Sequence, residues 1–147
     1  MNASRKIVLA ATGLALSAMA HAQMTPVGNW HSIDDATGKP RAEISIRDKG
    51  NGVLVGKVER SLQAPSPDPV CSLCTDDRKG QPKIGLEIIR DAVRSGTDLV
   101  WEGGTILDPE NGKVYKLRLA PQDGGRTLQV RGYIGPFYRT QLWQRVQ

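Results

Sequence analysis

Histidine, cysteine and aromatic residues are scarce in this chain. Its 147 residues include two His, two Cys and one Phe, and aromatic residues account for only 5%. One histidine, His21, lies in an N-terminal segment that we expect to be removed, which leaves His31 as the only histidine of the mature chain. Because histidine is the usual acid–base group and a common zinc ligand, this scarcity excludes most histidine-dependent chemistry.

Familiar catalytic motifs are missing as well. The chain has no Gly-x-Ser-x-Gly elbow, no Walker loop and no His-Glu-x-x-His. Two pairs of adjacent carboxylates occur, Asp34-Asp35 and Asp76-Asp77. Neighbouring side chains of an extended chain point in opposite directions, and Asp is common in turns, so neither pair indicates catalysis. We therefore expect no enzymatic activity, no metal site and no cofactor.

Long apolar runs are limited to the first 22 residues. Arg5 and Lys6 precede an Ala- and Leu-rich stretch over residues 7–20, and Ala20-His21-Ala22 is a small-x-small cleavage site. The stretch is shorter than the about 20 apolar residues that a membrane-spanning helix needs. We expect residues 1–22 to be a signal peptide that is cleaved after Ala22. The mature protein is then periplasmic or secreted, with no integral membrane segment.

The expected mature chain is only mildly basic. Lys and Arg number 20 against 15 Asp and Glu, and removal of Arg5 and Lys6 lowers the net charge from +5 to +3. So small an excess does not indicate a polyanionic partner, and we expect no nucleic-acid binding. Residues 23–147 have the length of one domain, so a second domain is not expected.

From residue 28 onward, short runs of alternating apolar and polar residues are separated by Gly, Pro, Asn and Asp. This pattern is typical of consecutive antiparallel strands. Asn111-Gly112 supplies the positive φ of a hairpin, and Gly103-Gly104 indicates a bulge or bend. We predict eight strands, over residues 28–33, 42–47, 53–60, 84–90, 99–107, 114–120, 127–134 and 138–146. A helix over residues 86–94 is the alternative to the fourth strand.

These eight strands predict an all-β fold. Tight turns and the lack of a crossover helix favour an eight-stranded antiparallel up-and-down barrel, because closure removes the exposed edges of an open sheet. A sandwich of two sheets is the alternative, since strand patterns do not report closure. A barrel of eight strands encloses either its own side chains or one small ligand.

Both cysteines, Cys71 and Cys74, lie in a proline-rich segment over residues 61–83 that we expect to be a long irregular loop. A thioredoxin-type pair begins a helix after a strand, and haem attachment needs His where this chain has Thr75. We expect a small-ring disulfide that shapes the loop in an oxidising compartment. Thiol–disulfide exchange is the alternative.

A tryptophan opens the first expected strand, and an arginine lies in the last. The sequences are Gly28-Asn29-Trp30 and Trp143-Gln144-Arg145. A guanidinium stacked on an indole ring adds about 0.5–2 kcal/mol of cation–π attraction. The pattern resembles the lipocalin arrangement, which implies that Gly28, Trp30, Trp143 and Arg145 close one end of the barrel.

Further motifs extend this resemblance over residues 28–146. They are Cys71-x-x-Cys74, Ile84-Gly85-Leu86, Trp101-x-Gly103-Gly104-x-Ile106-x-Asp108-Pro109-x-x-Gly112-Lys113-x-Tyr115, Arg131-Gly132-Tyr133-Ile134-Gly135 and Arg139-Thr140-Gln141-x-Trp143-x-Arg145. In this order and spacing the chain resembles the bacterial domain-of-unknown-function family 2147 (DUF2147), small exported proteins with a lipocalin-like barrel. The resemblance implies that fold and a small-molecule pocket, and it implies no reaction.

The function predicted from these observations is non-enzymatic binding of a small apolar or amphipathic ligand inside the barrel, driven by desolvation of the ligand. Strand alternation predicts which side chains face the interior and line the pocket. The candidates are Ile44, Ile46, Tyr115, Leu117, Val130 and Ile134.

Two alternative functions stay open. The first is thiol–disulfide exchange by Cys71 and Cys74, and the second is the role of an envelope protein-interaction module. The interaction surface would be the long loop or a basic stripe on the outer faces of neighbouring strands, formed by Lys116, Arg118 and Arg131. A solvated surface is the simplest interpretation of that stripe, and an anion or membrane-surface patch is the alternative.

Overall fold

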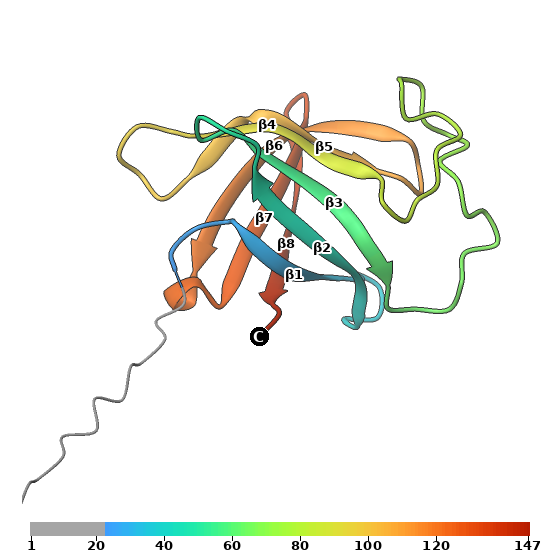
Figure 1. The fold of residues 1–147 in the computed structure, drawn as a ribbon, viewed down its shortest axis with the longest axis horizontal. Helices are drawn as coiled ribbons and strands as arrows, with labels where there is room; N and C mark the ends of the chain where they lie inside the picture. Colours follow the sequence, from blue (N-terminus) through green and yellow to red (C-terminus); the bar gives the residue numbers. More distant parts are fainter. Residues whose placement is uncertain (1–22) are drawn as a thin grey trace, which may run out of the picture.

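The computed structural model describes residues 23–147, which form an eight-stranded antiparallel barrel (Figure 1). The predicted signal peptide, residues 1–22, lies outside the described residues. In chain order the elements are β1 (Gly28–Ile33), β2 (Pro40–Asp48), β3 (Leu54–Ser61), β4 (Glu87–Arg94), β5 (Trp101–Asp108), β6 (Lys113–Gln122), the 3-10 turn η1 (Asp123–Gly125), β7 (Thr127–Ile134) and β8 (Phe137–Arg145). None of the described helices is long or apolar enough to cross a membrane.

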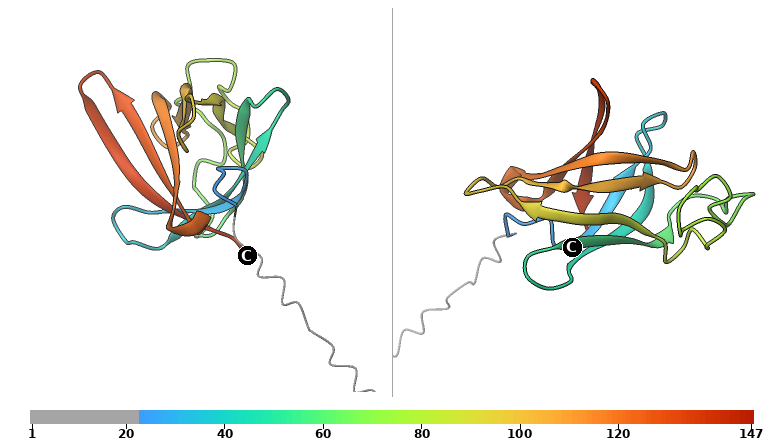
Figure 2. Two further views of the ribbon diagram at one scale, coloured as in Figure 1. Left: turned by 90° about the vertical axis from the view of Figure 1, so that its left-hand side faces the viewer. Right: turned by 90° about the horizontal axis from the view of Figure 1, so that it is seen from above.

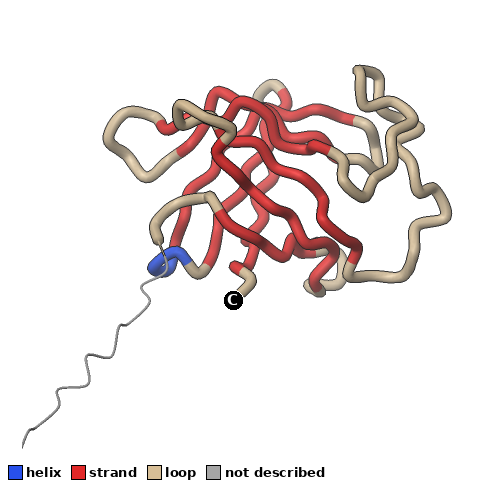
Figure 3. Tube along the Cα trace, viewed as in Figure 1, coloured by secondary structure: helices blue, strands red, loops and turns tan. Residues whose placement is uncertain are grey.

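Each strand pairs with the next along the chain, and β8 returns to β1. The predicted all-β up-and-down barrel is therefore confirmed, and the alternative sandwich is wrong. The closing seam is short, because β1 and β8 share only two residue pairs, Trp30 with Arg145 and His31 with Gln144. The neighbouring seam between β7 and β8 has eight such pairs. Figure 3 shows that strands and connecting loops make up this architecture, with η1 as a short helical turn before β7.

Alternation of apolar and polar residues explains which face of each strand is buried. On β6, Leu117 and Leu119 are buried while Lys116 is exposed. On β3, the buried face carries Leu54, Gly56 and Val58, a choice that the sequence pattern leaves open. Apolar residues on the inward faces thereby build one continuous core.

The fourth strand begins later than its sequence pattern predicts. Gly85 has a φ of +86° and donates its N–H to the Val58 carbonyl, so residues 84–86 form a turn against β3. Strand pairing starts at Glu87 and runs to Arg94, which makes the predicted range of 84–90 wrong at both ends and the alternative helix wrong. Buried side chains on consecutive residues, Ile88 and Ile89, hide the simple alternation of a strand.

The predicted bulge at Gly103-Gly104 is confirmed by a shift in the register of β5 and β6 between Glu102 and Thr105. A Cβ atom on Gly104 would lie 2.1 Å from the Arg90 carbonyl oxygen. Only glycine permits this close approach of the β4 and β5 backbones.

One end of the barrel is closed by Arg145. Its guanidinium lies 4.2 Å from the centre of the Trp30 ring and donates hydrogen bonds to four main-chain carbonyls, those of Gln23, Thr25, Val27 and Gly125. The Trp30 indole N–H donates to the Pro26 carbonyl at 2.7 Å. The N-terminal segment before β1 and the turn before β7 are therefore held together by one side chain.

Gly28 leaves room for this arrangement. A Cβ atom at this position would lie 2.3 Å from an Arg145 guanidinium nitrogen, and the backbone has a φ of +142°.

Beneath Arg145 the barrel is packed solid with side chains that are almost completely buried, among them Trp30, Ile46, Ile89, Leu119 and Leu128. The packed core thus occupies the closed end.

Substitution of Arg145 by Met should lower the free energy of unfolding by at least about 2 kcal/mol, because charge-assisted hydrogen bonds to several carbonyls are lost together. Urea denaturation measures the change. The control is Arg126→Met, since Arg126 is exposed and forms an ion pair with Asp123, three residues away, which solvent and salt screen. Equal losses for the two variants would show that Arg145 is not the closing residue.

Candidate functional site

A cavity of about 720 Å³ lies at the open end of the barrel, opposite Arg145. This volume is within the range of small-molecule sites, about 300–1,000 Å³. All eight strands contribute to its wall, and the long loop between β3 and β4 covers one side. Figure 2 shows this loop folded beside the barrel at the end of β3. The barrel is therefore hollow above a packed floor.

The interior wall of the cavity is mainly apolar. Ile44 of β2, Val58 of β3 and Val130 of β7 project into it, and Trp143 of β8 lies among them. The Trp143 indole N–H donates to Gln141 Oε1 at 2.9 Å, so its polar atom is satisfied within the wall. Apolar parts of a ligand that contact these side chains would leave water, with about 25 cal/mol of stabilisation per Å² buried.

Tyr115 of β6 supplies a polar group near the rim. Its hydroxyl accepts a hydrogen bond from the Asn111 side-chain amide at 3.2 Å. Across from it, Gly132 of β7 lacks a side chain, and a Cβ atom there would lie 3.1 Å from the Tyr115 Cβ. Gly132 therefore gives the Tyr115 ring its space in the cavity wall.

Charged side chains gather at the mouth, around Glu110. The Lys83 ammonium lies 3.1 Å from one Glu110 carboxylate oxygen, and an Arg41 guanidinium nitrogen lies 3.7 Å from the other. Lys83 also contacts the Ser66 hydroxyl at 3.4 Å, and its side chain is only 12% exposed. Two cations share one carboxylate at the rim of an apolar cavity.

A second polar cluster bridges the gap beside the short closing seam. Asp35, in the turn after β1, forms an ion pair with Arg139 of β8 and accepts a hydrogen bond from the Gln141 amide at 3.0 Å. Both Arg139 and Gln141 line the cavity. Side chains therefore join β8 to the β1–β2 turn where the two strands no longer pair.

The six candidate ligand residues are distributed unequally. Ile44, Tyr115 and Val130 line the cavity. Ile46 and Leu117 are buried in the packed core, outside the cavity wall. Ile134 lies at the end of β7 and is exposed.

The residues expected to close the barrel also separate. Gly28, Trp30 and Arg145 meet at the closed end, whereas Trp143 lines the cavity. Alternation identifies inward side chains but not their height along the barrel axis, which decides between core and cavity. The loop residues of the wall, such as Lys83 and Ser66, carry no periodic signal and were missed by sequence reasoning.

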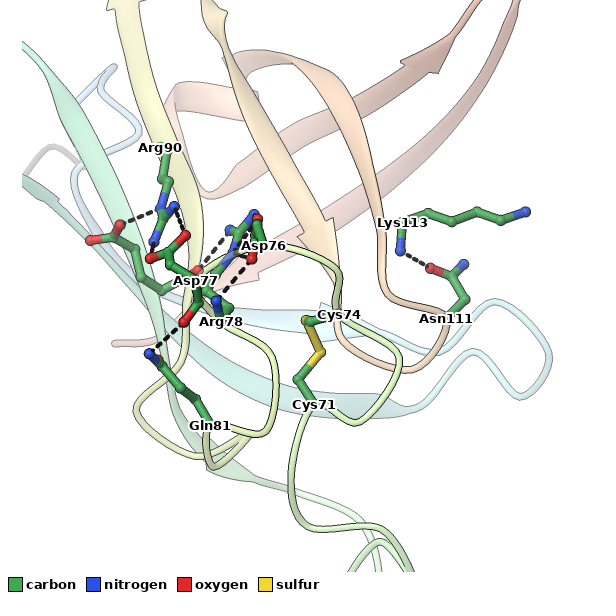
Figure 4. A network of polar contacts seen from close by, with 10 residues as sticks. Cys71, Cys74, Asp76, Asp77, Arg78, Gln81, Arg90, Asn111 and Lys113 are labelled. Atoms are coloured by element: carbon green, nitrogen blue, oxygen red, sulfur yellow. Dashed lines mark hydrogen bonds and ion pairs between the residues drawn. A yellow bond between two sulfur atoms is a disulfide. The ribbon is translucent and has the colours of Figure 1, made fainter.

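Cys71 and Cys74 form the predicted disulfide, with their Cα atoms 5.4 Å apart (Figure 4). Both residues are buried, and the loop that contains them packs on the turn between β5 and β6. A Cβ atom on Gly112 of that turn would lie 2.0 Å from the Leu73 carbonyl oxygen. The disulfide therefore shapes a loop that leans on the barrel, and burial shields its sulfur atoms from thiolates.

Arg78 anchors the segment that follows the disulfide. It is buried, donates to the Asp76 carboxylate through two guanidinium nitrogens and donates to the Glu87 carbonyl at 3.0 Å (Figure 4). Asp77 pairs in the same way with Arg90 of β4. The two adjacent carboxylates thus hold the long loop to the start of β4, and nothing in the sequence pattern marks Arg78 and Arg90 as their partners.

Hydrogen bonding from Arg78 lowers the pKa of Asp76 from 3.8 to about 2. Between these values the unfolded chain binds more protons than the folded one, so the stability that Asp76 contributes is complete above about pH 4 and is lost as the pH falls to about 2.

In the residues that the structure describes, no group of three potential metal-ligating side chains was found.

Asp76→Asn should lower the free energy of unfolding at neutral pH by about 1 kcal/mol, a value reduced because the carboxylate is partly exposed and screened by solvent. The difference from the unmodified protein should shrink as the pH falls from about 4 to about 2. Urea denaturation over this pH range measures it. The control is Asp98→Asn, on the exposed β4–β5 turn. If the difference in the free energy of unfolding caused by Asp76→Asn did not change with pH, the lowered pKa assigned to Asp76 would be contradicted.

The folded protein should keep its disulfide in millimolar dithiothreitol, because both sulfur atoms are buried. Alkylation followed by mass measurement reports the number of modified cysteines. The same treatment in urea should modify both. Rapid modification of the folded protein would instead indicate an exchange-active pair.

Comparisons with known proteins agree with the barrel. No curated protein of similar sequence was found. Among solved structures, the chain is similar to protein HP1028 from the human pathogen Helicobacter pylori, which belongs to the lipocalin family. The two share 17% sequence identity over 82% of each chain, with a TM-score of 0.68, and this likeness concerns the fold. Residues 28–145 match the family model described as "Uncharacterized protein conserved in bacteria (DUF2147)", and the chain belongs to this family.

Proposed function

We propose that this protein is an exported, non-enzymatic carrier that holds one small amphipathic molecule in the open-end cavity. One observation supports it above the others: a cavity of about 720 Å³ with an apolar interior lies beneath a charged rim. The lipocalin-like barrel agrees with small-molecule binding in general. Periplasmic location or secretion follows from the expected signal peptide.

The ligand lies with its apolar part against Ile44, Val130 and Trp143, and with its polar end at Lys83 and Glu110. Burial of the apolar part drives binding by desolvation. The rim groups give direction, because a polar end that entered the apolar interior would lose its hydration without new partners. Ile44, Tyr115 and Val130 keep the role expected from the sequence, and Lys83 and Glu110 join them.

Thiol–disulfide exchange is the weaker proposal. Exchange requires a thiolate that can attack an accessible sulfur atom. Cys71 and Cys74 are both buried, and Cys71 Sγ faces the Pro109 carbonyl at 3.7 Å. These surroundings support a structural disulfide.

Native mass spectrometry of the protein purified from its own envelope tests ligand carriage. The expected spectrum contains an added mass that denaturing extraction removes. Ala42→Trp should abolish the added mass, because Ala42 lines the cavity and an indole ring there fills the space. Ala36→Trp places the same side chain on the exposed β1–β2 turn and should leave the added mass unchanged. Bare protein in the unmodified form, or equal occupancy in both variants, would contradict the proposal.

A further inference from the structure

Three consecutive strands of the barrel contain no acidic residue. Together β6, β7 and β8 carry six Lys or Arg and neither Asp nor Glu. Two of these cations have roles already described: Arg145 closes the barrel, and Arg139 pairs with Asp35. A third, Lys113, begins β6. The remaining three form the basic stripe: Lys116, Arg118 and Arg131.

The basic stripe lies on adjacent strands. Arg118 stands directly opposite Arg131 in the register of β6 and β7, and Lys116 stands opposite Tyr133. On its other side Arg118 stands opposite Glu102 of β5, with which it forms no ion pair. The Arg118 guanidinium donates to Gln129, and that of Arg131 donates to Thr140, so their partners are neutral. Within residues 23–147, none of the three cations takes part in an ion pair. Like charges placed opposite each other in a sheet repel, and an external anion relieves that repulsion.

An apolar tip lies beside the stripe, at the hairpin between β7 and β8. Its residues are Ile134, Phe137 and Tyr138, which are 43%, 76% and 61% exposed. Gly135-Pro136 turns the chain between them. Figure 2 shows this hairpin, in orange and red, projecting beyond the neighbouring turns.

The stripe and the tip form one continuous surface. The Arg131 guanidinium lies 4.6 Å from the centre of the Tyr138 ring, and the Tyr133 and Tyr138 rings are 5.7 Å apart. This surface also lies beside the cavity mouth, because Gly132 and Arg139 of the same hairpin line the cavity. Exposed aromatic residues, unpaired cations and the cavity therefore occur at one end of the molecule.

We propose that this surface docks on a bilayer that contains anionic phospholipids. The projecting tip inserts its apolar side chains among the acyl chains near the headgroups, and the stripe contacts lipid phosphates. The tip is a projection and not a hollow. A deformable bilayer accommodates a projecting apolar group more easily than the surface of a folded protein partner does. Docked in this way, the cavity mouth lies near the lipid surface. Membrane binding itself does not depend on the cavity holding a ligand.

Co-sedimentation with vesicles tests the docking. The chain without residues 1–22 is used, because the whole barrel lies within residues 23–147 and the leader segment is itself apolar. One set of vesicles is phosphatidylcholine, and the other contains phosphatidylglycerol in addition. The unmodified protein should sediment with the second set and should be released by added salt.

Two substitutions separate the apolar and electrostatic contributions. Phe137→Ser should weaken the partition constant at least about tenfold, because a Phe side chain no longer leaves water. Lys116→Gln should weaken it about fivefold. The matched controls, Leu99→Ser on the β4–β5 turn and Lys79→Gln on the long loop, alter exposed residues away from this surface and should bind as the unmodified protein does.

The opposite results would overturn the proposal. They are no sedimentation with phosphatidylglycerol vesicles, equal sedimentation with both vesicle types, or equal losses in the tip variant and its control. Each variant is compared by far-ultraviolet circular dichroism, so that a loss of binding is not a loss of fold. Because Phe137, Lys116, Leu99 and Lys79 are all exposed, the four variants are expected to fold.

Discussion

The contact of Arg145 with Trp30 is the interaction on which the rest of the barrel depends. Backbone pairing contributes only two residue pairs to the closing seam, so side chains must complete the closure. Arg145 does this by stacking on the indole ring and by donating to carbonyls from the N-terminal segment and from the turn before β7. The Arg145 guanidinium is half-buried, so its N–H groups and the main-chain carbonyls satisfy one another's hydrogen bonding. Because four carbonyls must converge on one side chain, the arrangement is specific.

Closure at one end permits a cavity at the other. With the closed end packed around Trp30, Ile46 and Leu119, the open end does not need to be filled for the barrel to be stable. There the wall is held by polar contacts at the edges: Arg78 and Arg90 bind the loop carboxylates, and Asp35 bridges to β8. The disulfide and these ion pairs give a long, proline-rich loop a definite position over the cavity.

The two ends of the molecule consequently carry different properties. The cavity, the charged rim and the projecting β7–β8 hairpin all occur at the open end. The two proposed roles have a common requirement. Carrying an amphipathic molecule and docking on lipid both need apolar groups next to charged groups. Each is supported by different residues, so each can hold without the other.

The sequence alone determined the strand order, the disulfide and the meeting of Gly28, Trp30 and Arg145, because each has a local pattern or a family motif. It did not decide where β4 begins, since a turn at Gly85 binds to β3, a contact between residues far apart in the chain. Alternation likewise placed Ile44, Ile46 and Leu117 inside without distinguishing cavity from core. Only the tertiary structure decided that, because height along the barrel depends on the register of all eight strands. Lys83, Glu110 and Arg41 come together from the long loop, the β5–β6 turn and β2, which only the packing of the loops on the barrel decides.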